Sequence, residues 1–131
     1  MLNGILSVAD AQRARQAGVQ GIVVSNDGGR QVDGAIAALD ALPGIAQAVG
    51  SELAVLFDGG IRGGADMLKA LALGAQAVLL GRPYVYGLAL GGEAGVRHVV
   101  RALRADFEFT MRLAGLATLA ELGPDCLQRH Q

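Results

Sequence analysis

The sequence predicts an α/β fold in which parallel strands alternate with helices. Three apolar runs, at residues 19–24, 53–57 and 77–80, are continuous rather than alternating, which is typical of strands buried on both faces. Segments with helical spacing separate the runs, as crossover helices between parallel strands require. Three Asp-Gly pairs could instead mark hairpin turns. We reject hairpins, because the neighbouring runs lack the two-residue alternation of hairpin strands and helices intervene.

The first half of the chain should place helices on either side of its first strand. A short stretch up to residue 6 precedes Ser7, whose hydroxyl can cap a helix that ends at Gly18. The first strand follows and leads into a turn rich in glycine and polar residues. A helical layer then covers residues 35–42 and 45–49. Pro43 is expected to interrupt this layer, because proline has no backbone N–H and its ring crowds the preceding turn.

The second half should contain two more strands, a short helix and a long helix. The second strand is followed by a helix over residues 65–73 that Gly74 closes, and the third strand by a helix from about Gly92 to Leu116. The apolar stripe of the long helix consists of Val96, Val99, Val100, Leu103, Phe107 and Met111. Its opposite face, expected to be solvated, carries Arg97, Arg101, Arg104, Glu108 and Arg112.

An internal repeat indicates how these units assemble. At a constant offset of 56 residues, Gly4-Ile5, Ala9-Asp10, Ala14 and Gly18 recur as Gly60-Ile61, Ala65-Asp66, Ala70 and Gly74. Two strand–helix units in 56 residues give about 28 residues per unit, close to one eighth of a (β/α)8 barrel of about 250 residues. The count yields three strands and the stub of a fourth. We therefore expect residues 1–131 to form one partial domain, the C-terminal half of a TIM (β/α)8 barrel.

Composition excludes several classes of protein. Hydrophobic residues make up 52% of the chain, enough for a substantial core, and the net charge of −1 without a basic run argues against a nucleic-acid partner. No apolar stretch approaches the roughly 20 residues of a membrane span, and no signal peptide is expected. The single cysteine, Cys126, suits a reducing compartment, so we expect a cytoplasmic protein. His98 and His130 lack metal-ligand spacing, and no metal site is expected.

The candidate site lies in the turns that follow the strands, because the carboxyl ends of parallel strands meet at one edge of a sheet or barrel. The turn after the first strand holds Asp27, its one obvious acid–base group, and Arg30, whose planar fork suits a carboxylate or phosphate. The turns after the second and third strands hold glycines, which let the backbone approach an anion, together with Arg62 and Arg82.

Four motifs carry a resemblance to a known family. They are Ser-Asn-x-Gly-Gly-Arg-Gln-x-Asp at 25–33, Asp-Gly-Gly-Ile-Arg at 58–62, Lys-Ala-Leu-Ala-Leu-Gly-Ala at 69–75 and Gly-Arg-Pro at 81–83. In this order and spacing they resemble the C-terminal half of the flavin mononucleotide (FMN) dependent 2-hydroxy acid oxidising family, which includes glycolate oxidase, lactate oxidase and flavocytochrome b2. Residues 31–45 and 82–92 look most like its lactate 2-monooxygenases. The resemblance implies oxidation of a small 2-hydroxy acid such as L-lactate, with hydride transfer to FMN.

The resemblance also implies roles for individual residues. Arg30 would bind the substrate carboxylate through a bidentate pair, and Ser25 would lie beside the flavin ring. Asp27 stands where the family has the histidine that removes the substrate's hydroxyl proton. Asn3 stands at a cofactor-binding position where the family has the lysine that stabilises the reduced flavin. The ribityl chain and phosphate of FMN would be held by Asp58, Gly59, Gly60, Arg62, Gly81 and Arg82.

Because Asp27 and Asn3 replace the family's histidine and lysine, more than one function remains open. An aspartate is a weaker base than histidine by about 2.5 pKa units, and Asn3 carries no charge, so we expect little or no turnover from this chain alone. Asp27 is alternatively a turn residue that caps local N–H groups or pairs with Arg30. The rival function is a non-catalytic half-barrel that binds an anion or the FMN phosphate, or that assembles with itself or with an N-terminal half-barrel. A gene product without function is the third possibility.

Overall fold

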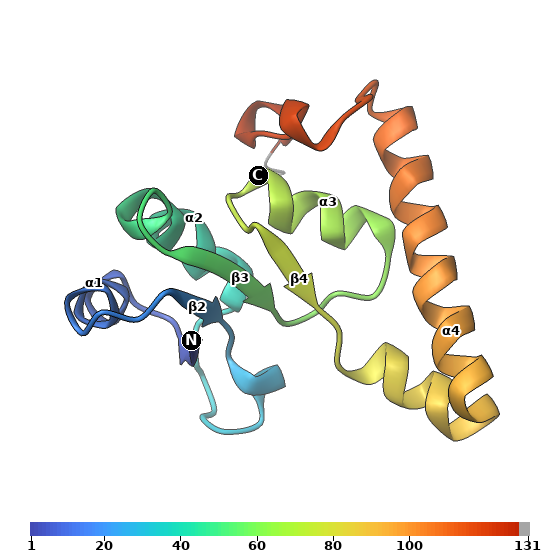
Figure 1. Ribbon diagram of the computed structural model, residues 1–131, viewed down its shortest axis with the longest axis horizontal. Coiled ribbons are helices and arrows are strands. Elements are labelled where there is room, and N and C mark those ends of the chain that lie inside the picture. Colours follow the sequence, from blue (N-terminus) through green and yellow to red (C-terminus); the bar gives the residue numbers. More distant parts are fainter. Residues whose placement is uncertain (129–131) are drawn as a thin grey trace.

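The structure is a computed structural model that describes residues 1–128, and it contains a four-stranded parallel sheet in the order β1-β2-β3-β4. The strands are β1 (Leu2–Ile5), β2 (Gly21–Val24), β3 (Ala54–Asp58) and β4 (Ala77–Leu79). The helices are α1 (Val8–Gln16), α2 (Ala38–Val49), α3 (Gly64–Ala72) and α4 (Arg82–Leu113). Figure 1 shows the helices arranged around the outside of the sheet, with α4 beside α3. The predicted alternation of parallel strands and helices is confirmed, and β1 is the expected fourth strand.

The register gives the sheet one covered face and one open face. Ile22 pairs with Val55, and Val24 with Phe57, so these four side chains point to the same side. They are fully or almost fully buried in the core with helix residues such as Leu42 of α2. The side chains of the other face are exposed or half-exposed at Asn3, Leu56, Ala77 and Leu79. Helices therefore cover one face of this sheet and leave much of the other open.

The two halves of the internal repeat have the same local structure. Helices α1 and α3 each span nine residues, and both ends are offset by 56 positions. Ser7 caps α1 as predicted, since its Oγ accepts a hydrogen bond from the Asp10 backbone N–H at 3.1 Å. Gly74 follows α3 with φ +107°, a backbone conformation that favours glycine. The repeat in the sequence is therefore a repeat of strand–helix units.

Two helix predictions are wrong. Pro43 does not interrupt a helical layer: α2 is one helix with Pro43 inside it, and residues 35–37 precede it. The proline removes one backbone hydrogen bond, whereas Leu42 and Ile45 on either side of it are fully buried in the core. The gain from burying these side chains exceeds the loss of one bond in the helix.

The last helix also differs from its prediction, because α4 begins at Arg82 rather than near Gly92. The chain turns between two helical arms at Gly91 and Gly92, where Gly92 has φ +56°. The arms cross closely, since a Cβ on Gly87 would lie 2.7 Å from the carbonyl oxygen of Gly95. The absence of side chains at Gly87 and Gly95 therefore allows a helical hairpin that the sequence pattern did not reveal.

The second arm of α4 presents its apolar stripe much as predicted. Leu103 and Met111 are buried and Val96, Val99 and Phe107 are half-buried. Val100 is the exception and is exposed, so the prediction is wrong at this position. The predicted solvated face is confirmed, with all five of its charged residues exposed.

Beyond α4, hydrogen bonds from the backbone N–H groups of Thr118 and Ala117 lower the pKa of Glu121.

Candidate functional site

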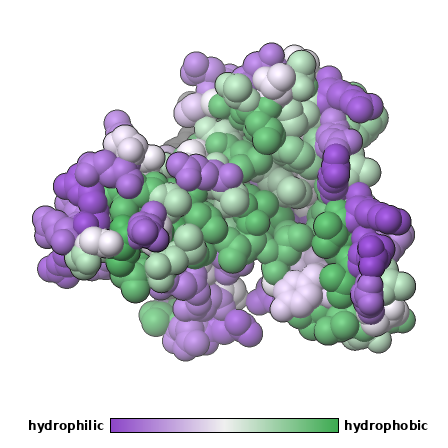
Figure 2. Space-filling view, in the orientation of Figure 1, coloured by the Kyte–Doolittle hydropathy of each residue, from purple (hydrophilic) through white to green (hydrophobic). Residues whose placement is uncertain are grey.

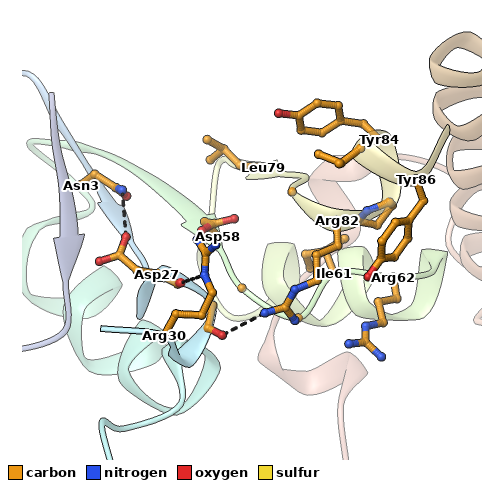
Figure 3. A pocket seen from close by; sticks show the side chains of 16 residues that line it. Asn3, Asp27, Arg30, Asp58, Ile61, Arg62, Leu79, Arg82, Tyr84 and Tyr86 are labelled. Atoms are coloured by element: carbon orange, nitrogen blue, oxygen red, sulfur yellow. Dashed lines mark hydrogen bonds between the residues drawn. The ribbon is translucent and has the colours of Figure 1, made fainter. Parts of the chain in front are cut away.

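A cavity of about 510 Å³ lies at the carboxyl ends of the strands, where the sequence places the candidate site. Nearly all of the predicted site residues line it, from turns that are far apart in the sequence. They are Asn3, Asp27, Arg30, Asp58, Gly59, Gly60, Arg62, Gly81 and Arg82. Figure 3 shows Asn3 and Asp27 on one side of the cavity and Arg62, Arg82 and two tyrosines on the other. The fold thus brings together side chains that the sequence separates by about eighty positions.

Ser25 is the predicted site residue that does not line this cavity. Its side chain is fully buried and lies beneath the turn. The Ser25 hydroxyl donates a hydrogen bond to Oδ2 of Asp58 at 2.8 Å and accepts one from the backbone N–H of Asp27 at 3.1 Å. The buried hydroxyl therefore has both a donor and an acceptor as partners, and it joins two turns that form the cavity wall.

Asp27 has an unusual backbone conformation in a short 3-10 turn (Asp27–Gly29). It is the one non-glycine residue with positive φ within residues 1–128, at +54°. Oδ1 of its carboxylate accepts a long hydrogen bond of 3.5 Å from the side-chain amide of Asn3. Within the described residues, the Asp27 carboxylate accepts no hydrogen bond from a backbone N–H group of its own turn, so the proposed capping role is wrong.

Arg30 contacts the same turn through the backbone rather than through the Asp27 carboxylate. Its Nε donates to the main-chain oxygen of Asp27 at 3.0 Å, and no ion pair joins the two side chains within residues 1–128. The alternative that Asp27 neutralises Arg30 is therefore wrong in this structure. The hydrogen bond uses Nε and not the terminal N–H groups of the guanidinium, which lies at the cavity near Asp58 (Figure 3).

The second turn offers open backbone next to a fixed loop. Gly59 and Gly60 have φ of +130° and +74°, and a Cβ on Gly60 would meet no other atom within 4 Å. Oδ2 of Asp66 accepts hydrogen bonds from the backbone N–H groups of Arg62 and Gly63, both at 3.0 Å, which fixes the loop to the start of α3. The Arg62 side chain itself is exposed and lines the cavity.

Positive charge accumulates around the cavity. Arg82 donates from Nη2 to the carbonyl oxygen of Gly28 at 3.1 Å, so it reaches from the start of α4 to the first turn (Figure 3). The ion pairs of the described residues involve other arginines and none of Arg30, Arg62 and Arg82. Three guanidinium groups without a carboxylate partner, next to a glycine-rich turn, form a site suited to an anion.

The sequence reasoning assigned no role to the apolar side of the cavity. Leu79 and the first turn of α4, with Tyr84, Val85 and Tyr86, line this side. Proline near the start of a helix is a known signal, so Pro83 after Gly81-Arg82 could have indicated that these residues begin a helix at the cavity. The cavity therefore combines a charged side with an aromatic one.

The other cavity and the histidine of the described residues do not form a second candidate site. A cavity of about 370 Å³ adjoins the first and shares with it the lining residues Gly28, Gly59, Gly60, Ile61 and Arg82. Residues 1–128 contain no cluster of three or more His, Cys, Asp or Glu side chains that could hold a metal ion. His98 lies exposed on α4, whereas His130 lies outside the described residues. None of the helices in this described part is long and apolar enough to cross a membrane.

Comparisons with known proteins agree on one family. The family model described as FMN-dependent dehydrogenase matches residues 1–129. The chain is 55% identical over 129 residues to an FMN-dependent alpha-hydroxy acid dehydrogenase of Penicillium citrinum, which covers 98% of this chain and 32% of the relative. It is 56% identical over 122 residues to an L-lactate oxidase of a Nostoc species, covering 93% of this chain and 33% of that protein. The chain thus spans about a third of the length of these curated relatives.

A solved structure shows the same fold. A mandelate oxidase variant with a monooxide FMN adduct superposes with a TM-score of 0.87 at 50% sequence identity, over 91% of this chain and 38% of the other. Such oxidases are TIM barrels, and the match covers part of one. The predicted fold class, part of a TIM barrel with parallel strands and outer helices, is confirmed.

Proposed function

Because the chain belongs to the FMN-dependent dehydrogenase family, we propose that its cavity is the carboxyl-terminal share of an FMN and 2-hydroxy acid site. The reaction would be oxidation of a small 2-hydroxy acid such as L-lactate with hydride transfer to FMN. The observation that carries the proposal is the convergence of Arg30, Arg62 and Arg82 on one cavity beside an open glycine turn. Relatives named for lactate, 2-hydroxy acid and mandelate oxidation support the substrate class.

The residues at the cavity fit FMN. Its phosphate would lie against the backbone of Gly59 and Gly60, with Arg62 and Arg82 supplying charge, because the glycines expose their backbone and the space beside Gly60 is open. Arg30 would hold the substrate carboxylate with its terminal N–H groups. Bound FMN would supply the hydride acceptor. Gly81, Asp58, Ser25 and Asn3 would complete the cofactor site by family resemblance.

Turnover by this chain alone should be very low. Asp27 stands where the family has its histidine, and a carboxylate is in general a weaker proton acceptor than an imidazole. It also adds negative charge beside the carboxylate that Arg30 would bind. The amide of Asn3, which contacts Asp27, supplies no charge to a reduced flavin. Binding is therefore the activity that the cavity supports best.

We expect the 131-residue chain to bind FMN through its phosphate, and Arg62→Ala or Arg82→Ala to weaken this binding by about ten- to a hundredfold. A charge-assisted hydrogen bond to a phosphate contributes about 1.5–3 kcal/mol. Quenching of FMN fluorescence during a titration measures the dissociation constant. Arg101→Ala is the matched control, because Arg101 is exposed on α4 and does not line the cavity.

The same titration can refute the site. A purified chain that is colourless, monomeric and unable to quench FMN fluorescence would remove the cofactor site from the proposal. Equal losses of affinity in Arg101→Ala and Arg82→Ala would assign the binding to overall charge rather than to the cavity.

The open face of the sheet supports a second candidate function, a non-catalytic half-barrel that assembles with another copy or with an N-terminal half-barrel. Figure 2 shows apolar surface gathered across the middle of the molecule, between hydrophilic groups at its two sides. Leu79 and the residues Val85, Leu88 and Leu90 of α4 are exposed, with Leu90 at 90%. Strands β1 and β4 are edge strands with unpaired backbone groups. A chain with these features is expected to associate with another copy or with an N-terminal half-barrel.

Substitutions on the two faces of β3 should separate assembly from folding. We expect the unaltered chain to associate, and Leu56→Asp to yield a folded monomer, because Leu56 lies on the open face. Phe57→Asp should unfold the chain, since Phe57 is 1% exposed and a buried unpaired charge costs several kcal/mol. Sedimentation velocity gives the mass of each variant and circular dichroism its helix content. An unaltered chain that sediments as a folded monomer at every concentration, alone and mixed with an N-terminal half-barrel, would exclude the assembly function.

The cellular location belongs to the same proposal. The chain's single cysteine suits a reducing compartment, and on that ground we propose that the protein is cytoplasmic. Imaging of a tagged chain in its own cell would test this.

A further inference from the structure

Ser25 has an environment that differs from that of every other polar residue in the described part of the chain. It is the buried polar residue there, with 0% of its surface exposed. It lines neither the cavity of the proposed site nor the second cavity beside it. A fully buried hydroxyl between two turns of a binding site is placed to hold those turns together.

The strand register explains which groups Ser25 meets. Val24 pairs with Phe57 in the parallel ladder between β2 and β3, so the next residues, Ser25 and Asp58, lie side by side where the strands end. The Ser25 hydroxyl has one proton, and a backbone N–H can only donate. Since Oγ accepts the Asp27 N–H, the hydroxyl proton must go to the Asp58 carboxylate, and both partners are fixed by one side chain.

The backbone of Asp27 depends on this bond. Its φ of +54° lies in the left-handed region, which is unfavourable for a non-glycine residue. The bond from its N–H to Ser25 offsets part of that cost. In this conformation the carbonyl of Asp27 meets Nε of Arg30, and the next carbonyl, of Gly28, meets Arg82 (Figure 3). Two consecutive carbonyls therefore fix two of the cavity's arginines.

We propose that Ser25 is a positioning residue, whose hydroxyl ties the Asp58 carboxylate to the backbone of Asp27 and thereby holds Arg30 and Arg82 at the cavity. This inference rests on the proposed function in so far as the two arginines bind the ligands. The hydrogen-bonding part concerns the chain itself and does not require a bound cofactor.

The test compares Ser25→Ala with the unaltered 131-residue chain by amide hydrogen exchange. Loss of a bond of about 1 kcal/mol should speed exchange of the Asp27 amide about five- to tenfold, and the Nε–H groups of Arg30 and Arg82 should become more mobile in NMR relaxation. Amides of β2 should keep their rates. Ser25→Cys fills the same space but donates weakly, so it should give the same local effect if Ser25→Ala does not fold. Ser51→Ala, at an exposed serine in a turn, is the control.

The exchange rate of the Asp27 amide tests the positioning role, and the affinity for FMN tests the proposed function. An Asp27 amide that exchanges at the same rate in Ser25→Ala and in the unaltered chain overturns the positioning role. Titration of the same samples with FMN should show affinity reduced about tenfold in Ser25→Ala. If the unaltered chain does not bind FMN, the proposed function fails, and the exchange rates still decide the role of Ser25.

Discussion

Gly64→Ala should lower the free energy of unfolding by about 3 kcal/mol or more, because Gly64 is where α3 meets the backbone of α4. A Cβ at this position would lie 2.3 Å from the backbone nitrogen of Phe107 and 2.4 Å from the carbonyl carbon of Asp106. These are main-chain atoms inside a helix, so relief requires movement of α4 as a whole. Gly64 also donates its N–H to the Asp106 carboxylate at 2.5 Å, a bond that such movement would break.

The sign of the stability change in Gly64→Ala shows whether α3 packs closely on the backbone of α4. Alanine is the better helix former by about 0.5–1 kcal/mol, so at a helix start without close neighbours Gly64→Ala would stabilise the chain. Urea denaturation followed by circular dichroism measures the change. Gly123→Ala is the matched control, since a Cβ there meets no atom within 4 Å and φ is −160°, and it should change stability by less than about 0.5 kcal/mol. Gly64→Ala at or above the stability of the control would contradict the packing of α3 on α4.

The sequence predicted much of the site because parallel strands place their carboxyl ends together. Continuous apolar runs located β2, β3 and β4, and that alone required the turns containing Arg30, Arg62 and Arg82 to share one edge. The sequence motifs also indicated the correct family. The local sequence pattern was therefore sufficient for the fold class and for the charged and glycine residues that line the cavity.

Features that depend on contacts between distant backbones were not predictable. The helical hairpin of α4 requires Gly87 and Gly95 to meet, and nothing in the local pattern distinguishes these glycines from those of a flexible loop. Pro43 was misjudged because burial of Leu42 and Ile45 outweighs a local preference. The buried position of Ser25 follows from the register of β2 and β3, which a single sequence does not reveal.

Replacing Asp27 should have the largest effect on catalysis, and a chimaeric enzyme allows it to be measured. In the chimaera, this chain takes the place of the matching third of the Nostoc L-lactate oxidase. We expect Asp27→His together with Asn3→Lys to raise turnover of L-lactate by about 10²–10⁴, the usual contribution of a positioned acid–base group. Histidine has a pKa near neutral pH, and removing the carboxylate also removes repulsion of the substrate, about 3 kcal/mol for charges about 5 Å apart at an effective dielectric constant near 20.

Single substitutions in the chimaera separate the two contributions. Asp27→His alone should account for most of the gain in kcat, because it restores a base, whereas Asn3→Lys alone should act mainly on the flavin and shift its reduction potential upward. Flavin content by absorbance normalises each rate, so a loss of FMN is not mistaken for a loss of chemistry. The isolated 131-residue chain with both substitutions should remain inactive, since four parallel strands do not close a barrel. A chimaera that oxidises lactate equally fast with Asp27 and with histidine would show that the aspartate is itself a competent base at this turn.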